Sequence, residues 1–386
     1  NSDTEVLIHA YEEYGEDMLN KLRGMFAFVI WDSEKETLFG ARDFFGIKPF
    51  YYTVVDGNII YGSEIKSILA HPAYKKEVND VALENYLTFQ YSVLPETFFK
   101  GVYKLMPGHC FTFHNGEINI KRYWEPTFEA DESKSLDEFV KEIDDAMHDS
   151  VEHHKISDVE VGSFLSSGVD SSYVAATFNG DKTFTVGFLD KNSKYNEIRY
   201  AESLVKELGK ENYNKTIDSD EYFNSIPTVM YYMDEPLADP SCIALYFVDQ
   251  VAAEQIKVVL SGEGADEFFG GYNIYHEPLS LKGYQKLPKG LRKGLAAIAK
   301  KLPDIKGRDF IIRGSKDVEE RFIGNANMFS VEEREKYLKH PITHIPPKDI
   351  VASTYKKVEG LNDIAKMQYI DTNFWLQGDI LLKADK

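Results

Sequence analysis

Two short segments combine serine, glycine and carboxylate residues in a way that suits phosphate and metal binding. One is Ser166-Ser167-Gly168-Val169-Asp170-Ser171, and the other is Ser261-Gly262-Glu263-Gly264-Ala265-Asp266-Glu267. Each follows an apolar run that predicts a strand and precedes a predicted helix, whose first N–H groups can face an anion. Small residues let the backbone approach a ligand, and carboxylates supply the oxygen ligands that Mg²⁺ takes. The segments therefore predict a site for a magnesium-bound polyphosphate.

A simpler explanation of either segment is an ordinary helix start, where Ser and Asp are common caps. One cap does not need several serines, a glycine and an aspartate together. An acidic helix start explains Asp266 and Glu267 but leaves the glycines unexplained. Neither segment is a Walker A or a GxGxxG motif, and both motifs are absent from the chain, which disfavours kinase-like phosphoryl transfer. The pairing of the two segments favours a nucleotide site.

Alternating strands and helices position both segments. From about residue 136 we expect strands at 159–165, 183–188, near Tyr213 and at 256–260, with helices between them. Such alternation predicts a parallel sheet covered by helices on both faces. Both segments then fall at the carboxyl edge of the sheet, where doubly wound folds bind their ligands.

The first 125 residues predict a different architecture, rich in antiparallel strands. Runs at 25–31 and 37–42 predict one hairpin, and runs at 49–55 and 58–61 predict another around an Asp-Gly turn. Helices are expected near 4–22 and 63–69. The polar stretch 126–135 reads as a linker, so that we expect one domain over 1–125 and a second over 136–386.

Composition narrows the class of function. The chain carries 44 Lys+Arg against 63 Asp+Glu, a net charge of −19, which argues against broad contact with nucleic acid or an anionic membrane. Cys110 and Cys242 lie far apart, which excludes a disulfide scaffold and fits a reducing, cytoplasmic setting. The longest apolar run, from Met25 to Trp31, is too short to span a bilayer. We therefore expect a cytoplasmic protein that acts on small molecules.

Taken together, the segments resemble the synthetase domain of glutamine-dependent asparagine synthetases of the B type. That domain belongs to the PP-loop ATP pyrophosphatases, whose SGGxDS signature is matched here with Ser167 in place of the first glycine. The segment 261–267 is more specific to these synthetases, and the closing 382–386 resembles a basic family segment. Upstream, 42–52 and 103–108 are similar to a class II glutamine amidotransferase domain. The resemblance implies an α/β protein, with an Ntn-hydrolase type αββα domain followed by a Rossmann-like parallel sheet.

The resemblance also implies a reaction and its residues. The reaction is ATP-dependent amidation of aspartate through β-aspartyl-AMP, with ATP, Mg²⁺, aspartate, and glutamine or ammonia as partners, and a homodimer stays open. Glu263 is the expected general base and Lys386 the cation that neutralises the departing pyrophosphate. Asp170 and Asp266 are expected to hold Mg²⁺, and Asp3 to bind the glutamine amino group. The residues expected to bind ATP or pyrophosphate are Leu165, Ser166, Ser167, Gly168, Asp170, Ser171, Val186, Ser261 and Gly262.

One departure from the family concerns glutamine use. These amidotransferases use an N-terminal cysteine as nucleophile, whereas residue 1 here is Asn1. We therefore expect that parts of the protein are missing at both ends and that this chain as written does not hydrolyse glutamine. Two alternatives stay open. One is a related synthetase that amidates or cyclises another carboxylate, as β-lactam synthetases and peptidoglycan-precursor amidases do, and the other is a non-catalytic scaffold, against which the intact carboxylates argue.

Overall fold

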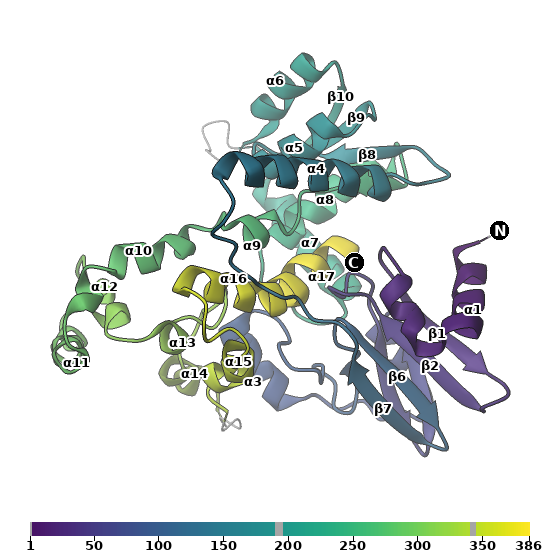
Figure 1. The fold of residues 1–386 in the computed structure, drawn as a ribbon, viewed down its shortest axis with the longest axis horizontal. Coiled ribbons are helices and arrows are strands. Elements are labelled where there is room, and N and C mark those ends of the chain that lie inside the picture. Colours follow the sequence, from purple (N-terminus) through teal and green to yellow (C-terminus); the bar gives the residue numbers. More distant parts are fainter. Residues whose placement is uncertain (1, 190–195, 340–344) are drawn as a thin grey trace.

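The N-terminal part of the chain forms two antiparallel sheets. The computed structural model describes residues 2–189, 196–339 and 345–386, so that Asn1 lies outside the described residues (Figure 1). The first sheet has the order β1-β2-β6-β7 and the second the order β4-β3-β5. Their strands are β1 (Ala27–Asp32), β2 (Thr37–Arg42), β3 (Tyr51–Val55), β4 (Asn58–Gly62), β5 (Tyr103–Lys104), β6 (His109–His114) and β7 (Glu117–Arg122). Both predicted hairpins are confirmed, because β1 pairs with β2 and β3 pairs with β4.

These two sheets pack face to face between helices. Tyr52 of the second sheet, with Phe50 and Leu105 next to its strands, shares one buried cluster with Phe111 of the first. Helix α1 (Asp3–Tyr14) and the 3-10 segment Gly15–Lys21 cover the outer face of the first sheet, and α2 (Ile65–Leu69) covers the second. The layers therefore follow the expected αββα order. The predicted single helix over 4–22 is wrong in one respect, because Gly15 adopts a φ of 56° and ends α1 there.

The C-terminal part contains the predicted parallel sheet. Its strands are β8 (Val161–Phe164), β9 (Lys182–Phe188), β10 (Glu211–Ile217) and β11 (Val258–Leu260), in the order β10-β9-β8-β11. Neighbouring strands all run parallel. Helices α4 (Leu136–His154), α5 (Val169–Thr177) and α6 (Ile198–Leu208) pack on one face, and α8 (Ser241–Ala253) packs on the other. The chain winds from β8 to β10 in one direction and then returns to place β11 beside β8.

The remaining helices surround this sheet or connect it to the two antiparallel sheets of the N-terminal part, which we call the sandwich. Helix α4 begins after Ser135, which forms a capping box with Glu138, and residues 126–135 form neither helix nor strand. In Figure 1, α16 (Asp363–Asn373) and α17 (Leu381–Asp385) lie between the parallel sheet and the sandwich, while α10 (Glu277–Leu281), α11 (Lys289–Ala299) and α12 (Arg308–Gly314) extend away from both. The other helices are α3 (Asp80–Phe89), α7 (Ser219–Met233), α9 (Ala265–Phe269), α10 (Glu277–Leu281), α11 (Lys289–Ala299), α12 (Arg308–Gly314), α13 (Val318–Arg321), α14 (Val331–Tyr337), α15 (Pro347–Lys356), α16 (Asp363–Asn373), the π-helical turn Leu376–Ile380 and α17 (Leu381–Asp385). Within the ranges that the structure describes, no helix is both long and apolar enough to cross a membrane.

Candidate active site

The two predicted segments meet at the carboxyl edge of the parallel sheet. One follows β8 and the other follows β11, and these strands are neighbours at the point where the winding direction reverses. Gly262 lies so close to the first segment that a Cβ there would be 2.8 Å from the Ser171 nitrogen and 2.9 Å from the Asp170 carbonyl carbon. Any side chain at position 262 would force the segments apart. Crevices at such reversal points are the usual ligand sites of open α/β sheets.

Hydrogen bonds between serine side chains shape the first segment. The Oγ atoms of Ser166 and Ser171 lie 2.8 Å apart, and Ser166 Oγ also accepts a bond of 3.0 Å from the Gly168 nitrogen. The exposed Ser167 donates its hydroxyl to Glu197. Its φ is not positive, so serine meets no backbone strain in place of the family's glycine. The segment thus presents hydroxyls and a helix start toward the same edge.

Leu165 and Val186 lie deeper in the sheet. The Leu165 nitrogen donates to the Phe184 carbonyl at 2.8 Å, and its carbonyl oxygen accepts from the Thr185 hydroxyl at 2.7 Å. Val186 is half-buried in β9 and pairs with Lys215 of β10. The sheet therefore already uses the Leu165 N–H group, and binding of adenine through these two residues stays a prediction.

The carboxylates of both segments influence one another. Burial raises the pKa of Asp266, and the negative charge of Asp170 raises it further. Glu263 is accessible to solvent, yet the protein atoms around its carboxyl group raise its pKa, and Asp239, Asp266 and Asp170 act in the same direction. The opposing effect comes from the Lys383 ammonium. The edge of the sheet therefore concentrates negative charge, which the Lys383 ammonium partly offsets.

This donor set fits a magnesium ion that is also bound by phosphate. Asp170 and Asp266 offer hard oxygen ligands, and their mutual repulsion favours a cation between them. In the part of the chain that the structure describes, no group of three or more His, Cys, Asp or Glu side chains forms a metal site. Phosphate oxygens would thus have to supply much of the coordination, as is common for Mg²⁺.

Lys386 lies elsewhere. Its Nζ atom is 2.9 Å from Asp234 and 3.2 Å from the Ser63 carbonyl oxygen, and it stands 5.2 Å above the ring of Tyr51. Both Ser63 and Tyr51 belong to the N-terminal sandwich. The structure therefore does not bring Lys386 to the two segments, and its assignment to pyrophosphate stays a prediction.

Sequence reasoning missed a charged cluster that influences the pKa of Glu263. Lys383 is 7% exposed, and its Nζ atom lies 2.5 Å from Asp239 Oδ2 and 2.8 Å from Ser241 Oγ. Asp379 lies one turn before Lys383, with 3.8 Å between the charged atoms. The i, i+4 spacing of Asp379 and Lys383 is visible in the sequence, whereas their approach to Asp239 is not.

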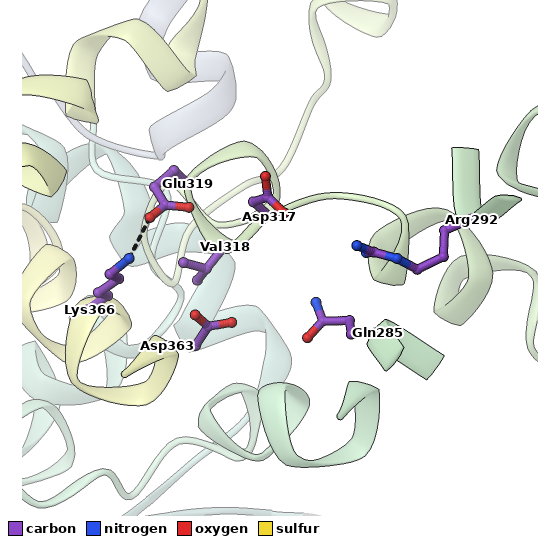
Figure 2. A pocket seen from close by; sticks show the side chains of 7 residues that line it. All are labelled: Gln285, Arg292, Asp317, Val318, Glu319, Asp363 and Lys366. Carbon is purple, nitrogen blue, oxygen red and sulfur yellow. Dashed lines mark hydrogen bonds and ion pairs between the residues drawn. The ribbon is translucent and has the colours of Figure 1, made fainter. Parts of the chain in front are cut away.

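Asp3 and one further cavity do not belong to the two segments. Asp3 is exposed in the first turn of α1, where it accepts a hydrogen bond from its neighbour Thr4, so its role in glutamine binding stays a prediction. A separate cavity of about 430 Å³ is lined by residues between 285 and 366, whose side chains are drawn in Figure 2. It contains none of the predicted site residues, and its Lys366 and Glu319 pair at 2.7 Å. The residues that line it are Gln285, Arg292, Asp317, Val318, Glu319, Asp363 and Lys366.

Comparison with known proteins identifies similar sequences for both parts. Residues 142–386 match the family model of asparagine synthase, and residues 1–124 match that of the glutamine amidotransferase domain. Glutamine-hydrolysing asparagine synthetase 1 of Bacillus subtilis is 43% identical over 100% of this chain and 61% of that protein. A putative glutamine-hydrolysing asparagine synthetase of Mycobacterium bovis is 39% identical over the same shares. The amidase chyE of Penicillium rubens is 32% identical over 71% of this chain and 44% of its own length. The chain thus spans about three fifths of the two synthetases.

Proposed function

The chain belongs to the asparagine synthase family, and on this premise we propose that it amidates aspartate to asparagine at the expense of ATP. Residues 136–386 would carry the synthetase site, and residues 1–125 would belong to the domain that supplies nitrogen from glutamine in the intact protein. The observation that carries the proposal is the contact of Gly262 with Asp170 and Ser171, which joins the two segments into one site. Two free, buried cysteines fit a cytoplasmic setting.

The first step would activate the carboxylate. An oxygen of the aspartate side chain attacks the α-phosphorus of ATP, the bond to the bridging oxygen breaks, and pyrophosphate leaves with β-aspartyl-AMP as product. N–H groups at the start of α5 and the hydroxyls of Ser166 and Ser171 are suited to donate hydrogen bonds to the pyrophosphate oxygens. Mg²⁺, held by Asp170 and Asp266, would offset phosphate charge while it is bound.

The second step would transfer nitrogen. Ammonia attacks the acyl carbon, and the new C–N bond leaves a positively charged nitrogen that must lose a proton before AMP departs. Glu263 is suited to take that proton, because its raised pKa makes the carboxylate a stronger base than an ordinary glutamate. Lys383 would keep enough of this carboxylate ionised to act.

Ammonia from glutamine would need a sheltered route between the two parts. A narrow cavity of about 40 Å³ lies where the sandwich meets α16, the π-helical turn and α17. We assign the route to this cavity, since it joins elements of both parts. Its lining residues are Arg42, Tyr51, Tyr91, Ser92, Val93, Lys104, Met106, Pro107, Asn373, Phe374, Gln377, Gly378 and Leu382.

A different carboxylate is the second candidate acceptor. The similarity to an amidase of Penicillium rubens favours it, because the printed name of that protein does not specify asparagine. Both candidates share activation by ATP and differ only in the acid that binds next to Glu263. A set of carboxylic acids assayed for pyrophosphate release would separate them.

The direct test supplies free ammonia, so that glutamine use does not matter. We expect the protein with ATP, Mg²⁺, aspartate and ammonium chloride to yield asparagine, AMP and pyrophosphate in equal amounts. The Asp170→Asn variant should release far less pyrophosphate. Formation of ADP instead of AMP, or pyrophosphate release that does not depend on any added carboxylate, would contradict the proposal.

A further inference from the structure

A buried ionic group influences the pKa of Glu263, and of its members only Lys383 has a part in the steps above. It consists of Asp239 and Ser241 at the start of α8 and of Asp379 and Lys383 near the C-terminal end, and we call it the α8–α17 cluster. Asp239 accepts hydrogen bonds from the Ser241 nitrogen at 2.9 Å and from its hydroxyl at 2.6 Å, in addition to its contact with Lys383. The Lys383 ammonium lowers the pKa of Glu263 and so opposes the effect of the surrounding protein atoms. The cluster is therefore part of the surroundings of the expected acyl carbon.

Asp379 is the unusual member of this cluster. It is 0% exposed, and among the residues that the structure describes neither carboxylate oxygen lies within hydrogen-bond distance of a donor, the Lys383 ammonium being 3.8 Å away. Burial raises its pKa to about 8, and the charge of Asp239 contributes to the shift. A buried carboxylate without donors is costly, and native proteins rarely leave one unless a ligand or water completes it.

The backbone holds Asp379 in this position through an irregular turn. Residues Leu376–Ile380 form a π-helical turn, a conformation that is rare and often found at functional sites. Gly378 makes the turn possible here, because a Cβ at that position would lie 2.2 Å from the ring of Tyr91. The chain thus uses a tightly packed and irregular turn to direct an acidic residue toward Asp239 and Lys383.

The charges of the cluster indicate the kind of ligand that would complete it. Lys383 is a cation among the carboxyl groups of Asp239, Asp379 and Glu263, and Asp379 keeps a proton while the cluster is empty. A positively charged group bound there would replace that proton. A primary ammonium group offers three N–H donors and matches carboxylate oxygens that lack donors. A metal ion is a poorer match, since no metal-binding group of three such side chains occurs among the residues described.

We propose that the α8–α17 cluster binds the α-ammonium group of the acceptor amino acid, with Asp379 as the residue that recognises it. This inference rests on the proposed function and sharpens it, because it restricts the acceptor to amino acids. Asp379 would accept hydrogen bonds from the ammonium group, while Lys383 holds Asp239 in place and faces the carboxylate side of the substrate. A dicarboxylic acid without an amino group, such as succinate, would leave Asp379 without donors and would bind poorly.

The test compares two aspartates that are equally buried. Asp371 is also 0% exposed with a pKa raised by burial to about 8, but it accepts hydrogen bonds from the Tyr275 hydroxyl and the Asn325 nitrogen. In Asp379→Asn we expect the KM for aspartate in pyrophosphate release to rise about 10- to 100-fold, as for loss of a charged hydrogen bond, with the Kd for ATP unchanged. Asp371→Asn should change thermal stability and leave the KM for aspartate within about twofold.

The wild-type protein provides a second measurement that does not depend on how the variants fold. It should use aspartate at least about tenfold better than succinate, and Asp379→Asn should reduce that preference. An unchanged KM and preference in Asp379→Asn, or equal use of succinate by the wild type, would overturn the inference. If the wild type instead activates a different amino acid, the proposed acceptor is wrong, yet Asp379→Asn must still raise the KM for that amino acid.

Discussion

Lys383 and Lys386, at the end of helix α17, belong to two different groups of lysine and aspartate. One group joins the sandwich to the synthetase part and consists of Asp234, Lys66 and Lys386. There Asp234 accepts bonds from the Ile65 nitrogen at 2.8 Å and from each lysine at 2.9 Å. Burial opposes ionisation, yet the Lys386 ammonium and these bonds hold the pKa of Asp234 below its usual value. The other group is the α8–α17 cluster, where Asp379 has no donor and its pKa is raised.

The contrast separates a structural ion pair from a binding site. Asp234 has its hydrogen bonds satisfied by the chain itself, so it can only hold the two parts together. Asp379 is left incomplete by the chain and can gain a partner from a ligand. Lys383 and Lys386 are only three residues apart, yet they serve these different groups. The predictions below test whether this division is correct.

The largest effect on the reaction rate is expected at Glu263, whose pKa the α8–α17 cluster influences. Replacing Glu263 by Ala should lower the rate of asparagine formation by about 10²- to 10⁴-fold, because the proton of the attacking nitrogen loses its acceptor. ATP should still bind, as calorimetric titration would show. The control on the interface side is Glu64→Ala, whose exposed carboxylate pairs with Lys66 and should leave the rate unchanged. Product formation at the wild-type rate in Glu263→Ala would remove Glu263 from the mechanism.

Exchange of each lysine for methionine tests the comparison directly. Lys383→Met leaves Asp239 and Asp379 without a cation, and we expect the ammonia-dependent rate to fall by about 100-fold. Lys386→Met should leave that rate within about threefold and reduce stability instead. Steady-state kinetics and chemical denaturation of both variants distinguish these effects. If Lys386→Met loses pyrophosphate release while Lys383→Met retains it, Lys386 takes the role that the sequence suggested.

The difference between these two lysines shows how far the sequence could lead. The apolar runs before Ser166 and Ser261 and the small residues after them predicted both strands and their common edge, because local patterns determine those features. The α8–α17 cluster depends on contact between residues about 140 positions apart. It also depends on a π-helical turn, which changes the direction of the following side chains and which helix propensities do not predict. Lys386 is predicted to act on pyrophosphate because segment 382–386 resembles a basic family segment, and that role stays a prediction. The Lys386 side chain contacts Asp234, which lies at the C-terminal end of helix α7.

In the group of Asp234, Lys66 and Lys386, the Asp234→Asn variant should be the most destabilising change. Its carboxylate accepts bonds from two lysines and two backbone nitrogens, and removal of its charge takes away the counter-ion of Lys386. We expect the free energy of unfolding to fall by about 2–3 kcal/mol. Denaturation in urea would measure this, and the ammonia-dependent rate should stay near that of the wild type. Full stability in this variant would mean that Asp234 does not hold the two parts together.

A smaller effect is expected where the two segments touch. In Gly262→Ala the new methyl group would meet the backbone of Asp170 and Ser171, so the segments must separate slightly. We expect the Kd for ATP to rise about tenfold. Gly290→Ala is the matched control, since a Cβ there has no atom within 4 Å. Unchanged ATP binding in Gly262→Ala would show that nucleotide does not sit between the segments.

The smallest effect concerns how the free energy of unfolding depends on pH, which should differ between Asp379 and Asp234. Asp379, with a pKa near 8 in the folded state, keeps a proton that the unfolded chain has already lost, so its contribution to stability is lost as pH rises through 8. Relative to wild type, Asp379→Asn should therefore gain about 1 kcal/mol in unfolding free energy between pH 7 and pH 8. Asp234 has a lowered pKa and is ionised in both states across this range, so the difference between Asp234→Asn and wild type should stay constant there and shrink only in acid. Denaturation curves at the two pH values measure both differences. A constant difference for Asp379→Asn would mean that its carboxylate is already ionised at pH 7, and Asp379 would then belong with Asp234 as a satisfied structural charge.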